Sequence, residues 1–104
     1  MNKINLAKDP TTSPETLELL STDDSWYFRS WVAENPNTPT HTLEELSYDD
    51  DFFVRVCVGV NPNTPITTLK KLLRDSHQAV RWEVARNHNL PNYLKRYIHY
   101  CKYL

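Results

Sequence analysis

The chain has 104 residues, of which 39% are hydrophobic and 12% aromatic, and its formal net charge at pH 7 is −1. No stretch approaches the roughly 20 apolar residues of a membrane-spanning helix, and the polar start lacks the apolar core of a signal peptide. The two cysteines, Cys57 and Cys101, form no paired motif. We therefore expect a single domain, 1–104, in a cytoplasmic protein with reduced thiols and no membrane contact.

A pentapeptide returns along the chain at a spacing of 26 residues. Asn-Pro-Asn-Thr-Pro occupies 35–39 and 61–65, and a diverged copy occupies 87–91. Further positions repeat with the same period: Leu17/Leu43/Leu69, Leu20/Leu46/Leu72, Asp23/Asp49/Asp75, Arg29/Arg55/Arg81 and Val32/Val58/Val84. A fixed period of roughly 20–50 residues is typical of stacked repeats. The spacing predicts three repeats, at about 9–34, 35–60 and 61–86.

The first helix of each repeat is predicted from its turn residues. The first copy holds one extra residue before Pro14, so its turn is expected to be looser than the others. In the second copy, Asn35 precedes a proline, which predicts the end of the preceding helix because that residue is pushed out of the α region. Thr38 and Pro39 then fit the N-cap and first residue of a short helix over about 39–47.

A turn over 48–51 predicts a second helix over about 51–60, capped by one of the turn aspartates. Leu43 and Leu46 lie three residues apart and face inward from the first helix. Gly59 is matched by alanine in the other copies, which indicates a close approach between neighbouring helices. Each repeat is therefore predicted to be a helical hairpin covered by the next copy.

After the third copy, residues 87–104 keep a proline and then space apolar residues at helical intervals between basic ones. This pattern predicts a C-terminal capping helix. No run shows the two-residue alternation of a strand. The predicted fold is an all-α stack of three helical-hairpin repeats of about 26 residues with this cap.

The third copy shows most fully a resemblance to a known family. Asn-Pro-Asn-Thr-Pro at 61–65, the pair Leu69 and Leu72, Asp75 and the Val-Arg-Trp-Glu-Val-Ala segment at 80–85 resemble the variant leucine-rich repeat family. The resemblance covers about residues 9–91. It implies a short right-handed solenoid of HEAT-like style, in some members with alternating α and 3₁₀ helices. The family is defined by repeat architecture, so the resemblance implies no particular activity.

Two features depart from the family. The period of 26 residues is slightly longer than is usual there. Some members carry a cysteine-rich iron–sulfur segment ahead of the repeats, and the printed sequence has no such segment. The iron–sulfur cluster is therefore not carried over to this chain.

The charges separate along the sequence. Residues 1–52 contain three Lys or Arg and eleven Asp or Glu, a net charge of −8, whereas residues 53–104 have a net charge of +7. In a stack of repeats, sequence order is spatial order, so this separation predicts an acidic end and a basic end. Head-to-tail self-association in a salt-dependent manner is one hypothesis that follows.

The recurring Asp and Arg positions admit two interpretations. A row of arginines at 29, 55 and 81 is suited to binding phosphates. Alternatively, each arginine bonds an aspartate or a turn carbonyl of its own or the adjacent repeat. The second interpretation is favoured because the pair recurs in the same phase as the core valines.

On a helical wheel, the variable positions of the second helices point away from the core but carry large aromatic residues. Exposed apolar groups of this size typically mark a contact site, unless neighbouring repeats or residues 1–6 cover them. The predicted partner-binding residues are Trp26, Tyr27, Trp31, Phe52, Phe53 and Trp82. The sequence thus favours a protein–protein interaction module with an unidentified protein partner.

The basic half of the chain offers an alternative, nucleic-acid binding, because basic residues lie near aromatic ones. The residues concerned are Lys70, Lys71, Arg74, Arg86, Lys95 and Arg96. A solvated charged end is the simpler interpretation.

Catalysis, a cofactor and a metal are not expected. Cys57 has no partner motif, the histidines lie in separate repeats, and one glycine cannot form a phosphate loop.

Overall fold

The computed structural model describes residues 2–95, and these residues are all-helical. They contain eight helices and no strand: α1 (Lys3–Lys8), α2 (Pro14–Leu20), α3 (Trp26–Glu34), α4 (Thr40–Leu46), α5 (Phe52–Val60), α6 (Ile66–Leu72), α7 (Gln78–Ala85) and α8 (Asn92–Lys95). The all-α prediction is confirmed. Half of the predicted capping helix, 87–104, lies outside the described residues, and in the other half Asn92–Lys95 form α8.

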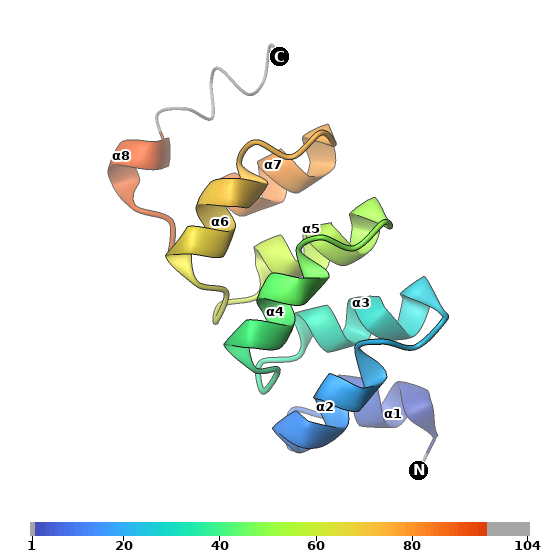
Figure 1. Ribbon diagram of the computed structural model, residues 1–104. Helices are drawn as coiled ribbons and strands as arrows, with labels where there is room; N and C mark the ends of the chain where they lie inside the picture. The colour runs from blue at the N-terminus through green and yellow to red at the C-terminus, as the bar shows by residue number, and fades with distance from the viewer. Residues whose placement is uncertain (1, 96–104) are drawn as a thin grey trace.

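The helices lie in two rows (Figure 1). In the first row, α1 packs on α3, α3 on α5 and α5 on α7, and these are the largest contacts between helices. In the second row, α2, α4 and α6 each pack on the helix that follows in sequence. The result is an elongated molecule with principal extents of 44 × 22 × 17 Å.

The first-row helices begin at capped residues. The side chains of Ser25, Asp51 and His77 each accept a hydrogen bond from the backbone N–H two residues later, at the starts of α3, α5 and α7. Such caps satisfy one of the N–H groups that the first turn of a helix leaves without a partner. The prediction that a turn aspartate caps the helix over 51–60 is confirmed by Asp51.

The predicted N-cap at Thr38 is wrong. The N-cap residue of α4 is Pro39, which offers no side-chain hydrogen bond, and the helix begins at Thr40. The hydroxyl of Thr38 instead donates to the carbonyl oxygen of Val32 at 2.6 Å, near the end of α3. The carbonyls of a last helical turn need such donors. Thr38 therefore terminates one helix and does not start the next.

The core lies between the two rows and is built from the recurring apolar positions. Leu43, Leu69, Val58 and Val84 are completely buried. At Gly59, a Cβ atom would lie 2.7 Å from Cγ2 of Val84 on α7. The predicted close approach of neighbouring helices at this glycine is confirmed.

Buried asparagines link successive helices of the first row. Each amide nitrogen donates two hydrogen bonds of 2.8–3.0 Å to backbone carbonyls 26 and 28 residues earlier. The pairs are Asn35 with Ala7 and Asp9, Asn61 with Ala33 and Asn35, and Asn87 with Gly59 and Asn61. We call these three residues the asparagine ladder. It explains why the sequence repeats this residue, beyond the helix-ending role expected of it.

Candidate interaction surface

Five large aromatic side chains lie exposed along the first row of helices. Their exposed fractions are between 40 and 46%, so they are in contact with solvent although they belong to packed helices. They are Trp26, Tyr27, Phe52, Phe53 and Trp82, and we call them the aromatic surface. The caps at the starts of α3 and α5 place the first four in the opening turns of these helices.

Ring contacts join the aromatic residues of neighbouring helices. Trp26 contacts Tyr27 on its own helix and Phe53 on α5 edge to face, with ring centroids 5.8 and 6.0 Å apart. Phe52 stacks on His77, the N-cap of α7, with a centroid separation of 3.9 Å. Edge-to-face and stacked pairs are favourable geometries that restrict side-chain motion. The rings therefore help to hold one another in place.

Trp31, the sixth predicted contact residue, has a different environment. Its side chain is partly buried and packs against the hydrophobic core. Nζ of Lys8 lies 4.5 Å from the centre of its ring, a cation–π distance. Tyr27, one helical turn earlier in α3, contacts the ring of Trp31 edge to face, with ring centroids 6.3 Å apart. Trp31 thus packs between the hydrophobic core and Tyr27, a residue of the aromatic surface.

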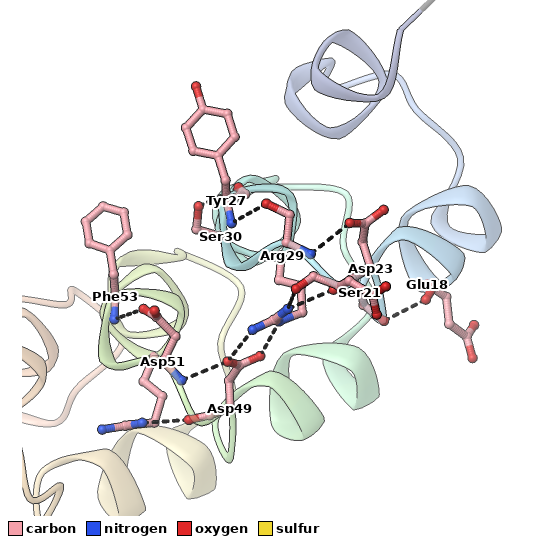
Figure 2. Close-up of polar contacts among 12 residues, drawn as sticks. Glu18, Ser21, Asp23, Tyr27, Arg29, Ser30, Asp49, Asp51 and Phe53 are labelled. Carbon is pink, nitrogen blue, oxygen red and sulfur yellow. Dashed lines mark hydrogen bonds and ion pairs between the residues drawn. The ribbon is translucent and has the colours of Figure 1, made fainter.

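The recurring arginines bond aspartates of the adjacent repeat, as Figure 2 shows for Arg29. Nε of Arg29 donates to Asp49 at 2.8 Å, and its Nη1 donates to the backbone carbonyl of Asp23 at 2.7 Å. Arg55 makes the same two kinds of bond, to Asp75 at 2.9 Å and to the Asp49 carbonyl at 2.6 Å. The structural interpretation of these two arginines is confirmed, and their guanidinium groups are already occupied.

The ion pairs and the aromatic rings lie on different sides of the helices. In Figure 2 the rings of Tyr27 and Phe53 project on the same side of α3 and α5, away from the pair between Arg29 and Asp49. The hydrogen bond between Arg29 and Asp49 raises the pKa of the guanidinium above its ordinary value. These pairs therefore hold neighbouring helices in register, while the opposite side remains available for contact.

The basic residues predicted for nucleic acid come from several elements. Lys70 and Lys71 lie in the last turn of α6, followed by exposed Arg74, while Arg86 is the C-cap of α7 and Lys95 ends α8. Nζ of Lys71 lies over the ring of Tyr48 at 3.1 Å and also donates to Ser47. Lys71 is thus engaged within the chain. Arg96 lies outside the described residues.

The only described cysteine is a poor nucleophile. Cys57 is buried in α5, and burial raises the pKa of its thiol to about 12, so the thiolate is scarce at neutral pH. Within residues 2–95, no group of three metal-ligating side chains comes together. In the same part of the chain, no helix has both the length and the apolar character needed to cross a membrane.

Comparison with known families gives one match. The family described as leucine rich repeat variant matches residues 28–51, which run from α3 through α4 to the cap of α5. No curated protein and no solved structure matched the chain. The matched segment contains Arg29, Asn35 and Asp49, which bond to neighbouring turns and helices. The match confirms, over this segment, the resemblance to the leucine-rich repeat variant family that the repeats carry.

Proposed function

We propose that this chain is a protein–protein interaction module that binds a partner protein through the aromatic surface. The observation that carries the proposal is the set of five exposed aromatic residues, four of which are held by ring contacts on α3 and α5. Trp and Tyr contribute most often to the energetic centre of protein interfaces. Repeats of this family are generally interaction modules, which supports the same conclusion.

The architecture suits such a role. We propose that the two rows of helices form a short right-handed solenoid, with repeats at about 9–34, 35–60 and 61–86. In a solenoid each unit adds a strip of surface next to the last, so residues far apart in sequence form one extended contact area. Trp26 and Phe53, 27 positions apart in the sequence, already do so, at 6.0 Å.

The test compares capture of proteins by two double variants. In Trp26→Ser/Phe53→Ser the centre of the aromatic surface is removed, and in Leu19→Ser/Tyr48→Ser two exposed side chains outside it are removed. Circular dichroism first establishes that both variants are folded. We expect proteins retained from a native lysate by the wild type to be lost by the first variant and kept by the second. Retention of the same proteins by both variants contradicts the proposal.

Nucleic-acid binding by the basic half is the second candidate. Lys70 and Arg74 are exposed on and after α6, whereas the position of Lys70 is occupied by Glu18 and Glu44 in the earlier copies. The basic character is therefore local to one end. A gel-shift experiment with generic DNA and RNA at low salt tests it: binding that is lost in Lys70→Glu/Arg74→Glu and weakens with salt supports this function.

A further inference from the structure

A column of cation–aspartate pairs runs along the first row of helices. In each pair the cation lies 20 residues before the aspartate that it bonds. Lys3 bonds Asp23 at 2.9 Å, and the Nε atoms of Arg29 and Arg55 bond Asp49 and Asp75 at 2.8 and 2.9 Å. In both arginine pairs, Nη2 donates to the second carboxylate oxygen, at 3.2 and 3.3 Å. Each carboxylate therefore binds the same edge of the guanidinium group.

Arg81 occupies the next place in this column. Its Nη1 donates to the backbone carbonyl of Asp75 at 2.6 Å, as Nη1 of Arg29 and Arg55 does to Asp23 and Asp49. The guanidinium group is thus anchored at its turn like the two before it. However, its Nε atom is buried, and among the described residues no atom accepts a hydrogen bond from it.

The printed sequence explains the missing acceptor. Twenty residues after Arg81, where the earlier copies place Asp49 and Asp75, stands Cys101. Residues 84–104 contain no Asp or Glu at all. Asp75 cannot also bind the Nε and Nη2 edge of Arg81, because its carboxylate already bonds Arg55 and the N–H of His77. Among the described residues, the edge of Arg81 that binds a carboxylate in the earlier copies therefore has none.

A buried charged donor without an acceptor is unfavourable, and a carboxylate is the ligand whose two oxygens match the Nε and Nη2 edge. We propose that Arg81 is a binding site for an aspartate or glutamate side chain supplied by a partner protein. Nε itself is buried, but the side chain is partly exposed as a whole, so the carboxylate approaches the guanidinium group from its exposed part. The site extends beyond the proposed function, because Arg81 is not part of the aromatic surface.

The carboxylate comes either from another protein or from a second copy of this chain. The second copy qualifies because its first 52 residues carry a net charge of −8, with exposed acids such as Asp24, Asp50 and Glu44. Both sources present the same chemistry to Arg81. They differ in whether the protein associates with itself.

Nuclear magnetic resonance of the arginine Nε–H groups tests the site in the wild-type protein. The probe is N-acetyl-aspartate N-methylamide, and the matched control is the corresponding asparagine compound at equal ionic strength. We expect a saturable shift of the Arg81 signal, assigned with Arg81→Lys, and none for Arg55, whose edge is occupied. An equal response to both compounds, or an Arg81 signal that moves no more than that of Arg55, overturns the proposal.

Sedimentation velocity then identifies the source of the carboxylate. Wild type, Arg81→Gln and the control Arg86→Gln, which loses the same charge from an exposed position, are compared at low and high salt. Self-association lost only in Arg81→Gln assigns the carboxylate to a second copy. A monomeric wild type, or association that persists in Arg81→Gln, excludes a second copy as the source.

Discussion

The asparagine ladder offers the sharpest test of how the helices are held together. Asn61 is completely buried, and its amide nitrogen donates to the carbonyls of Ala33 and Asn35 at 2.8 and 2.9 Å. Its side-chain oxygen accepts the N–H of Asn63 at 2.8 Å. Asn61→Asp keeps the shape and the acceptor but removes both donors, so it tests the two bonds to the preceding helix and turn.

The loss of stability expected for Asn61→Asp depends on which hydrogen bonds the two carbonyls keep. The carbonyl of Asn35 keeps a hydrogen bond from the N–H of Thr38 at 3.2 Å, so it loses only a second donor. Each lost bond costs about 0.5–1.5 kcal/mol, and an acceptor left buried without a donor costs about 1–3 kcal/mol. A carboxylate beside two carbonyl oxygens adds repulsion. We expect Asn61→Asp to lower the free energy of unfolding by about 3 kcal/mol, a large part of the total for a domain of this size.

Urea denaturation followed by tryptophan fluorescence measures this change. The control is Asn37→Asp, because Asn37 makes an equivalent bond to the carbonyl of Thr12 at 2.7 Å but is exposed, so water replaces the lost donor. We expect the control to cost less than about 1 kcal/mol. If Asn61→Asp is no more destabilising than Asn37→Asp, the ladder does not hold the helices together as described.

Three further outcomes are expected. Gly59→Ala should destabilise the protein by about 1 kcal/mol in thermal unfolding, because overpacking against Val84 exceeds the gain in helix propensity, and Val84→Ala should relieve this cost. In a Cys101→Ser background, Cys57 should react with a thiol reagent only as fast as the protein unfolds, since burial raises its pKa to about 12; rapid native labelling would contradict this. The pKa of Asp23 is lowered, first by the N–H of Ser25 and then by Lys3, so its contribution to stability is present above pH 3.8 and is lost as the pH falls through the lowered value. Denaturation at a series of pH values should therefore show a smaller loss in acid for Asp23→Asn than for the wild type.

Periodicity predicted the parts of the fold that every copy shares. The recurring leucines and valines are buried except Leu20, which is partly buried, and the second helix of the middle copy is α5, which begins one residue after the predicted start. The failure at Thr38 has a physical cause, because a threonine between two helices has two backbone groups within reach, and a short-range pattern does not tell which it bonds. Capping statistics favour the helix that follows, whereas the hydroxyl bonds the one before.

The candidate site was predictable only in part. A helical wheel identified Trp26, Phe52 and Trp82 as outward-facing, and these residues are exposed. Trp31 stands where the other copies have Cys57 and Glu83, so its partial burial depends on the core around it and on Lys8, neither of which a wheel describes. Likewise, the acceptor missing at Arg81 emerges only when three arginines are compared in three dimensions.

The asparagine ladder also bears on how the chain folds. Among the side-chain bonds of residues 2–95, none joins residues more than 28 positions apart in the sequence. Proteins whose contacts are this local close only short loops on the way to the native state, and they fold quickly. Each bond also couples one helix only to its neighbour, so opening at one end does not require opening at the other. Amide hydrogen exchange should therefore be slowest around Asn61, in the middle of the ladder, and grow faster toward α1.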